Sequence, residues 1–402
     1  MKTLAIALLL TTPVLAQSAV DPGHWNCELI TPGGPIRFGL KLDKTASSWN
    51  ASVLNPLERI SIPHVDVNGS EVTLKFPHYD SVIEAKLIGH RLEGTFRKRR
   101  GKAKLAKLTF RAERGERTKF DASLFAKYVG RWKVQFWRTE DPAIGLFAIT
   151  KNQRHPWGTF LTTTGDYRFL AVQNLTEQQA ELSVFDGAHA FLFRMKLDAE
   201  RKLTGEFWSS NSWHETFVGE LDPKAELPDA FHLTAALKKV KLNELKYRDL
   251  DGAEVSLGDS RFAGKARIIQ VFGSWCPNCH DAALYMAELH NRYGRRGLSI
   301  VGLAFEHTGD FDRDSEMVRR YIKRHGTQYP VLIGGLSDKV QATREFPLLD
   351  RVRSYPTTIF LDATGHVVSV YTGFSGPATG SAHKKLRARM QKQIEELLGT
   401  AR

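Results

Sequence analysis

The feature that most constrains this chain is a pair of cysteines placed shortly after a buried strand. Residues 267–272 form an apolar run typical of a strand in a parallel sheet. The motif Cys-Pro-Asn-Cys follows at residues 276–279, and residues 282–293 then carry apolar side chains at helical spacing. Residues 298–304 supply the next strand. The pattern predicts a β-α-β unit with both cysteines at the start of its helix.

Cysteines in that position favour thiol chemistry. Unpaired N–H groups and the helix dipole stabilise a thiolate, and the thiol pKa in Cys-x-x-Cys sites falls from about 8.5 to between about 3.5 and 7.5. We expect Cys276 to be the exposed nucleophile that attacks a substrate disulfide. Cys279, one turn further on, would resolve the mixed disulfide and form the redox-active disulfide with Cys276.

The same stretch also fits the Cys-x-x-Cys-His pattern of covalent haem attachment, completed by His280. Such haem motifs lie in small helical domains, whereas this one follows a buried strand and a tryptophan. A zinc site would need a second ligand pair at suitable spacing. We therefore expect no metal and no cofactor.

A second signal lies at residues 354–362, where Pro356 enters an apolar strand. Proline is disfavoured in a central strand unless the backbone does something special there, and a cis Tyr355–Pro356 bond would meet that condition. Residues 367–371 read as the hairpin partner of this strand. An amphipathic helix follows, marked by its apolar positions. These positions are Leu386, Met390, Ile394 and Leu397.

The segment between Phe305 and Tyr355 is longer than a single connection between two strands requires. Residues 315–325 predict a helix, residues 329–333 a strand and residues 337–346 a further helix. The whole region therefore reads as an α/β domain with one additional helix-strand-helix unit.

Taken together, residues 242–398 resemble the thioredoxin fold, and specifically the exported TlpA/ResA-type thiol–disulfide oxidoreductases. The resemblance rests on Trp275 with the cysteine motif after it, on the turn at residues 355–358 and on the lead-in at residues 249–257. The additional unit is what that subfamily inserts. The resemblance implies disulfide exchange with protein thiols and an upstream thiol electron donor, with cytochrome c maturation proteins among the possible substrates.

The resemblance also implies roles for individual residues. The proline turn of thioredoxin-like proteins contacts the substrate backbone, which carries over to Tyr355 and Pro356, with Trp275 as a further substrate contact. The family's buried acid, six residues before the first cysteine, is replaced here by Gln270. We therefore name Glu306 as the catalytic acid that exchanges a proton with Cys279. Asp281 would raise the thiolate pKa if it lay close.

Residues 17–221 are rich in short alternating runs, with Gly, Asn and Asp between them. The segment resembles itself at a spacing near 108 residues: Trp25 matches Trp132, and residues 92–96 match residues 203–207. The repeat predicts an all-β region made of a duplicated β-meander. The two copies would form two small barrels or two halves of a larger sheet.

We expect the copies to span about 24–120 and 121–221, a linker to span 222–240, and the thioredoxin-like domain to span 241–402. The tryptophans of the front half are expected in its core, although a small barrel can also hold an apolar ligand. Cys27 is expected to pack as a small buried hydrophobe, with intermolecular pairing or a redox relay as alternatives.

The first residues predict export. Lys2 supplies a positive start, residues 4–10 are apolar, and Val14 and Ala16 are the small residues of a cleavage site, so residues 1–16 read as a signal peptide. We expect a soluble protein of the periplasm or the wider bacterial cell envelope. Three cysteines in 402 residues are too few for a disulfide-stapled secreted fold.

The formal net charge of +13 favours acidic partners. A basic run predicts a hairpin tip that is either a solvated loop or a contact with an acidic envelope surface. Its members include Arg97, Lys98, Arg99 and Arg100. For an exported protein, nucleic acid is not an expected partner.

The leading hypothesis is thus an exported enzyme that exchanges disulfides with partner proteins, in the reducing direction, and serves redox homeostasis of the envelope. One alternative is an envelope ligand- or surface-binding protein whose thioredoxin-like domain only docks partners. Another is a peroxiredoxin-like peroxidase, although those enzymes place their cysteine in a Thr-x-x-Cys setting and this chain has Trp275 directly before Cys276.

Overall fold

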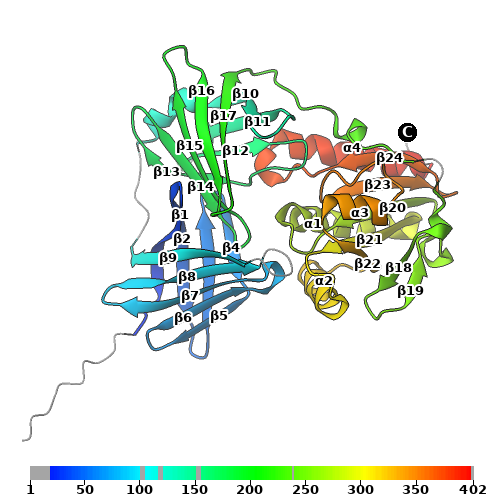
Figure 1. Cartoon of the computed structure of the whole chain (residues 1–402), viewed down its shortest axis with the longest axis horizontal. Helices are drawn as coiled ribbons and strands as arrows, with labels where there is room; N and C mark the ends of the chain where they lie inside the picture. Colours follow the sequence, from blue (N-terminus) through cyan, green and yellow to red (C-terminus); the bar gives the residue numbers. More distant parts are fainter. Residues whose placement is uncertain (1–18, 100–104, 116–120, 151–154, 238–239, 400–402) are drawn as a thin grey trace, which may run out of the picture.

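The computed structural model describes residues 19–99, 105–115, 121–150, 155–237 and 240–399. The expected signal peptide and Arg100 lie outside these residues. Within them the chain forms a nine-stranded sheet, a closed eight-stranded barrel and a seven-stranded sheet with helices, in that order along the sequence (Figure 1). Among the described helices, none has the length and apolar character that a membrane crossing requires.

The first part is an antiparallel sheet in the order β4-β3-β2-β1-β9-β8-β7-β6-β5. It is an open sheet whose edge strands are β4 and β5. The nine strands have these bounds: β1 (Gly23–Thr31), β2 (Gly34–Lys44), β3 (Trp49–Asn55), β4 (Glu58–Ile62), β5 (His64–Asn68), β6 (Glu71–Phe76), β7 (Ser81–Ile88), β8 (Arg91–Arg99) and β9 (Leu105–Arg114).

The second part closes on itself, β10 pairing with both β11 and β17. Its interior is filled by aromatic rings: Phe193 stacks on Phe160 with 4.6 Å between ring centroids and on Phe207 with 4.5 Å. The strands have these bounds: β10 (Gly130–Phe136), β11 (Ala143–Ile149), β12 (Pro156–Leu161), β13 (Leu170–Leu175), β14 (Ala180–Phe185), β15 (Ala190–Leu197), β16 (Leu203–Ser209) and β17 (Trp213–Leu221).

The open sheet completes its core with side chains of the barrel. Phe185, at the end of β14, contacts Phe38, Phe76 and Phe96, with 4.5 to 5.8 Å between ring centroids. The apolar face that the first sheet does not close by itself is thus covered by a barrel hairpin. The expectation of an all-β front region is confirmed. The region holds one open sheet and one closed barrel, which matches neither of the two expected arrangements, two small barrels or two halves of one larger sheet.

The matched tryptophans occupy equivalent places in the two parts. Trp25 lies on β1 and Trp132 on β10, and both are buried. Cys27, two residues after Trp25, is a buried free thiol in the core of the first sheet, as expected, and burial raises its pKa.

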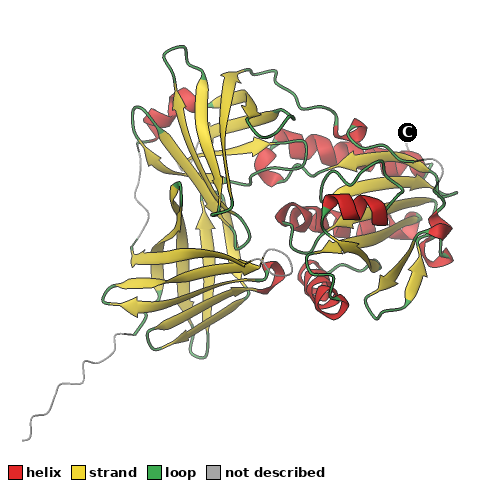
Figure 2. Cartoon of the chain, in the orientation of Figure 1, coloured by secondary structure: helices red, strands yellow, loops and turns green. Residues whose placement is uncertain are grey.

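The third part is a mixed sheet in the order β19-β18-β22-β21-β20-β23-β24, with helices around it (Figure 2). Strands β20, β21 and β22 run parallel, and β23 runs antiparallel to β20. The strands have these bounds: β18 (Lys246–Asp249), β19 (Glu254–Ser256), β20 (Ala266–Phe272), β21 (Leu298–Glu306), β22 (Val331–Leu336), β23 (Thr357–Asp362) and β24 (Val367–Thr372).

The helices of this part are α1 (Pro277–Tyr293), α2 (Phe311–His325), α3 (Lys339–Glu345) and α4 (Ser381–Leu397). Helix α1 contacts both α2 and α4: the Tyr321 hydroxyl donates to the Cys279 carbonyl and the Tyr285 hydroxyl donates to the Arg387 carbonyl. The expected α/β elements are all present. Not every apolar residue of the 282–293 stretch is buried: Leu284 faces outward and is 61% exposed.

Candidate redox site

The cysteine pair lies where β20 passes into α1. Cys276 is the N-cap residue of α1, and its carbonyl accepts hydrogen bonds from the N–H groups of Cys279 and His280, at 3.0 and 3.2 Å. Pro277 takes the first helical position, where the lack of an N–H costs nothing. Both sulfurs thus lie at the positive end of a 17-residue helix.

Cys276 is not exposed, and our expectation on this point was wrong. Its residue surface is 6% accessible, and its thiol donates to the Tyr355 carbonyl with 3.4 Å between the sulfur and the oxygen. The Tyr355–Pro356 peptide bond is cis, as expected. Segments that are distant in sequence therefore cover a sulfur that the local pattern would leave open.

Cys279 lies deeper than Cys276. It is 1% exposed, and burial, followed by its hydrogen bond with Cys276, raises its pKa well above the usual range. Both cysteines are free thiols in this structure, which is the dithiol form of a redox pair. A buried thiol that stays protonated beside a less buried one suits the second, resolving position of such a pair.

Glu306 is the last residue of β21 and is buried, rather than a surface acid in a loop. Its carboxylate accepts from the N–H and from the hydroxyl of Ser274, both at 2.7 Å. Burial raises the pKa of Glu306 to about 8, against the opposing effect of these hydrogen bonds. The acid is therefore tied to the turn that leads into Cys276.

Ser274 was not identified from the sequence. Its two contacts with Glu306 join the turn before Cys276 to the end of the neighbouring strand β21. A serine two residues before the motif could have been singled out from the sequence, because a hydroxyl group beside the buried end of a strand needs a hydrogen-bond partner.

The expected substrate contacts gather around the cysteine. The Trp275 indole stacks on His307 with 4.4 Å between ring centroids, and its N–H donates to the Phe305 carbonyl at 2.9 Å. Trp275 also meets the Tyr355 ring edge-on at 5.6 Å. Trp275 and Tyr355 thus form an aromatic corner beside Cys276, and Pro356 follows Tyr355 in the chain.

His280, the residue that completes the haem-like pattern, is buried and engaged on both ring nitrogens. Its Nε2 lies 2.8 Å from the Ser274 carbonyl and its Nδ1 lies 2.6 Å from Nε2 of His325 in α2. The ring of His78, from the first sheet, lies 5.4 Å from that of His280. Across the described part of the chain, no group of His, Cys, Asp and Glu is arranged to hold a metal ion.

Asp281 pairs with a cation of the barrel. Its carboxylate pairs with the Arg168 guanidinium at 3.3 Å, and burial raises its pKa to about 6. The sequence suggested an influence on the thiolate, but the closest partner that the structure gives Asp281 is this cation from another part of the molecule.

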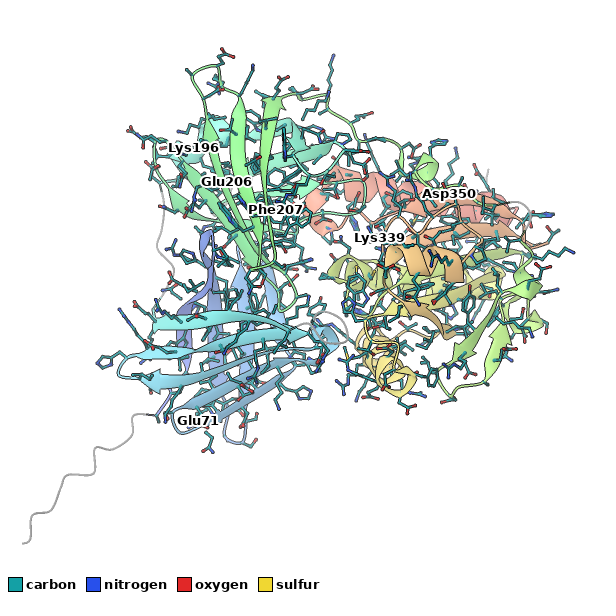
Figure 3. The ribbon with its side chains drawn as sticks, viewed as in Figure 1. Glu71, Lys196, Glu206, Phe207, Lys339 and Asp350 are labelled. Carbon is teal, nitrogen blue, oxygen red and sulfur yellow. The ribbon has the colours of Figure 1, made fainter. Side chains whose placement is uncertain are left out.

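Lys339 is a second residue that the sequence did not single out. It begins α3 (Figure 3) and interacts electrostatically with Cys276, while burial and the nearby Arg353 lower its pKa. Its position could not be read from the sequence because α3 and the motif lie about 60 residues apart.

The described members of the basic run are engaged with partners inside the chain. Arg97 donates to Glu84 at 2.6 Å, Arg99 donates to Asp80 at 3.0 Å, and Lys98 donates to a carbonyl of the barrel at 3.0 Å. These contacts fasten the end of β8 rather than leaving its charges free.

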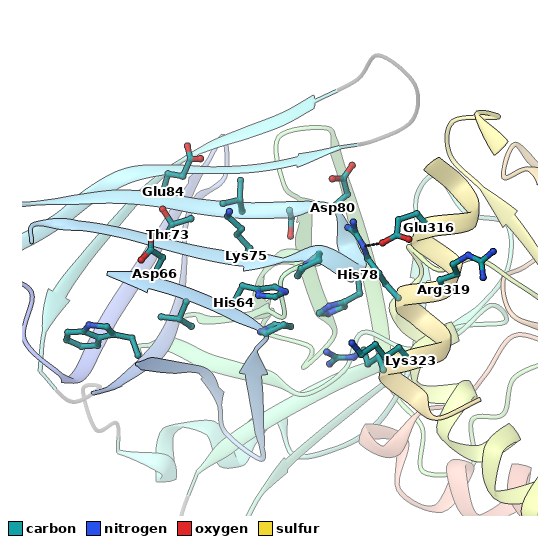
Figure 4. Close-up of a pocket in the computed structure, with 18 residues that line it drawn as sticks. His64, Asp66, Thr73, Lys75, His78, Asp80, Glu84, Glu316, Arg319 and Lys323 are labelled. Atoms are coloured by element: carbon teal, nitrogen blue, oxygen red, sulfur yellow. Dashed lines mark hydrogen bonds and ion pairs between the residues drawn. The ribbon is translucent and has the colours of Figure 1, made fainter. Parts of the chain in front are cut away.

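A cleft of about 1370 Å³ lies between the first sheet and α2 (Figure 4). His64, Asp66 and Lys75 come from its sheet wall, while Arg319 and Lys323 come from α2. Neither Cys276 nor Cys279 lines this cleft. The redox motif is therefore separate from it.

A strand that leads into a Cys-x-x-Cys helix, a cis-proline turn over the first cysteine and a mixed central sheet together define a thioredoxin-fold domain with a dithiol site. Comparison with known proteins agrees with this assignment: residues 223–386 match the model of the Redoxin family.

Relatives with named activities are similar to part of this chain. The thiol-disulfide oxidoreductase ResA of Bacillus thuringiensis subsp. konkukian is 28% identical over 125 residues, which cover 31% of this chain and 64% of that protein. ResA of Geobacillus kaustophilus is 29% identical over 125 residues, covering 31% and 63%. The alignments thus span less than two thirds of the length of these relatives.

Among solved structures, the chain is similar to a thiol:disulfide interchange protein of the thioredoxin family from Chlorobium tepidum. The match has 22% identity and a TM-score of 0.29, and it covers 43% of this chain and 99% of that one.

Proposed function

We propose that this chain is an exported thiol–disulfide oxidoreductase that exchanges disulfides with partner proteins through Cys276 and Cys279. The observation that carries the proposal is the position of Cys276 as N-cap of α1, with its sulfur against the carbonyl of the cis-proline turn. The kinship of the domain with ResA-type oxidoreductases supports the same activity.

In the reducing direction, the Cys276 thiolate attacks one sulfur of a substrate disulfide. A Cys276–substrate disulfide forms, and the second substrate sulfur leaves as a thiolate that takes up a proton. Cys279 then loses its proton and attacks Cys276, which releases the substrate as a dithiol and leaves a Cys276–Cys279 disulfide. An upstream thiol donor returns the pair to the dithiol. Two electrons thus pass from the enzyme to the substrate.

Trp275, Tyr355 and Pro356 are proposed to hold the substrate chain beside Cys276, because the aromatic corner and the turn flank the reacting sulfur. Glu306 is proposed as the group that accepts the Cys279 proton. A carboxyl group with a pKa of about 8 exchanges protons readily near neutral pH, and the charge of Glu306 acts on the Cys279 thiol.

The direction of exchange is proposed to be reductive, and a reduction potential tests it. A value near about −270 mV supports a reductase, whereas one near about −120 mV belongs to an oxidant. The activity itself is tested with insulin or another protein disulfide and dithiothreitol as the donor. Cys276→Ser is expected to abolish the exchange, and an unchanged rate would refute the proposal.

Cys279→Ser provides the complementary experiment, because it stops the reaction at the mixed disulfide. Captured partners would be identified by mass spectrometry after release with a reductant, and cytochrome c maturation proteins are among those proposed. A matched Cys276→Ser, Cys279→Ser double variant should capture none.

Export is proposed from residues 1–16 and is tested by the N-terminus of the mature protein, expected after Ala16. We also propose the division into residues 17–221, a linker at 222–240 and a redox domain at 241–402. The net charge of +13 supports contact with an acidic envelope surface. Arg97 and Arg99 already pair with acidic side chains of this chain. We therefore propose that other residues of the basic run, such as Arg100, contact the acidic surface.

A further inference from the structure

A tight hairpin joins β12 and β13 at the end of the barrel that faces the redox domain. Its tip, residues 162–166, is closed by the Thr162 N–H donating to the Gly165 carbonyl at 2.8 Å and by a bridge between Leu161 and Asp166. Gly165 and Asp166 are buried although they lie at the end of a hairpin. The surface that covers them belongs to the redox domain.

The tip first contacts the cysteine motif itself. A β-carbon at Gly165 would fall 1.9 Å from Nδ2 and 2.8 Å from Cγ of Asn278. Asn278 lies between the two cysteines, so the hairpin backbone packs directly on the Cys-x-x-Cys loop. A larger residue at position 165 would have to displace the Asn278 side chain or shift the tip.

The tip also contacts the turn that carries the cis proline. The Ser354 hydroxyl, next to Tyr355, donates to the Thr164 carbonyl at 3.0 Å. On the adjoining loop, a β-carbon at Gly373 would fall 2.8 Å from that same carbonyl. A backbone carbonyl of the barrel thus lies against the turn that we propose to bind the substrate backbone.

A third contact joins the tip to the loop that follows β24. The Gly376 N–H donates to the Asp166 carboxylate at 2.6 Å, and Asp166 is 5% exposed. Two ion pairs flank the tip: Arg353 with Asp141 on one side and Asp281 with Arg168 on the other. One hairpin tip therefore contacts the cysteine motif, the cis-proline turn and the loop after β24, and Cys276 is only 6% exposed.

We propose that the hairpin tip, residues 162–166, is an intramolecular cap on the substrate-docking face, held where a substrate polypeptide would lie. The inference rests on the proposed function, because it assigns an inhibitory role at that same site. A protein substrate must displace the tip before it reaches Cys276, whereas a small reagent needs less displacement. The barrel thereby limits which disulfides the enzyme exchanges.

The test measures access to Cys276 in the reduced full-length protein. Alkylation by a polymer-linked maleimide is compared with alkylation by iodoacetamide, and the modified Cys276 peptide is quantified by mass spectrometry. Gly165→Leu places a bulky side chain against the Asn278 amide. In case that variant does not fold, Asp141→Ala removes the ion pair with Arg353 and the hydrogen bond that Asp141 accepts from Thr163 of the tip. Gln178→Leu places a leucine on another, exposed hairpin of the same barrel as the control.

We expect the polymer-linked maleimide to react about tenfold faster with Gly165→Leu, since the reaction rate follows the uncapped fraction. The rate of alkylation by iodoacetamide should change less, and the Gln178→Leu variant should react with both reagents at the natural rate. A faster reaction in either folded cap variant, absent from the control, supports the cap. The natural rate in both cap variants overturns it.

The rate of exchange with a protein disulfide, measured on the same samples, distinguishes the proposed oxidoreductase activity from the proposed cap. Faster alkylation together with faster exchange agrees with both. Faster alkylation with no exchange in any sample refutes the oxidoreductase and leaves the cap standing. Exchange that proceeds while alkylation stays at the natural rate refutes the cap alone.

Discussion

The Arg168 guanidinium of the barrel lies 3.3 Å from the carboxylate of Asp281, two residues after Cys279. Arg168 also pairs with Glu58 of β4 and lies 3.5 Å from Asp186, between β14 and β15. One side chain, 12% exposed, therefore neutralises acids from the first sheet, the barrel and the redox domain. This cluster fixes how the three parts meet beside the redox motif.

Arg168→Ala should destabilise the chain strongly, because it leaves Glu58, Asp186 and Asp281 buried without their common cation. Removing one partner of a buried ion pair costs about 3–5 kcal/mol. The measurement is chemical unfolding of the full chain at neutral pH. Arg59→Ala is the control: Arg59 is 57% exposed in its pair with Asp43, and its loss should cost less than about 1 kcal/mol. Equal losses in the two variants would contradict the assigned role.

The local sequence was sufficient to predict the elements that hold the site. The apolar run of β20, the cysteine motif and the spacing of α1 are adjacent in the chain, so their geometry follows from strand and helix rules. The Tyr355–Pro356 turn could be anticipated in the same way, because a proline entering an apolar strand demands an unusual backbone.

Contacts between the parts could not be predicted. Arg168 and Asp281 are 113 residues apart, and Thr164 and Ser354 are 190 residues apart. Nothing in either neighbourhood marks them as partners, since a surface loop and an interface loop have the same composition. For that reason the expected exposure of Cys276 was wrong: the covering residues belong to segments whose position depends on the whole fold.

His78→Phe should make the chain less sensitive to acid. Burial lowers the pKa of His78 to about 3 and that of His325 to about 4, whereas an unfolded histidine has a pKa near 6.5. As the pH falls below 6.5, the unfolded chain therefore takes up protons that the folded chain does not. Stability is lost as the pH drops from 6.5 toward these values, by about 2 kcal/mol per histidine between pH 6.5 and 5.

Urea midpoints at pH 7 and pH 5 check this prediction. The natural chain should lose more stability than His78→Phe over that interval, since phenylalanine keeps the ring and removes the titration. His64→Phe, on an exposed position of β5, is the matched control and should behave like the natural chain. An identical loss in the natural chain and in His78→Phe would show that His78 protonates freely while folded.

Glu306→Gln should change the pH dependence of disulfide exchange. The folded pKa of about 8 lies above the usual 4.5, so most Glu306 is protonated in the folded chain at pH 7, and the stability gained from that protonation is lost as the pH rises from 4.5 to 8. The minor carboxylate fraction, which grows toward pH 8, is the form proposed to accept the Cys279 proton. Glutamine cannot exchange a proton. Exchange with a protein disulfide should slow about 100-fold at pH 7, and the inflection near pH 8 should disappear.

The control for that experiment is Glu316→Gln, which removes an exposed acid of α2. It should keep both the rate and the inflection. If Glu306→Gln exchanges at the natural rate across pH 6 to 9, Glu306 only holds Ser274 in place and transfers no proton.

Cys27→Ala should leave disulfide exchange unchanged while costing about 1 kcal/mol of stability. Cys27 is 1% exposed and lies in the core of the first sheet, its sulfur 4.0 Å from the Trp25 carbonyl, where no second thiol can reach it without unfolding. The rate of insulin reduction checks this, with Cys276→Ser as the inactive reference. A tenfold slower rate in folded Cys27→Ala would instead make Cys27 a redox relay, because packing alone cannot couple it to the distant cysteine pair.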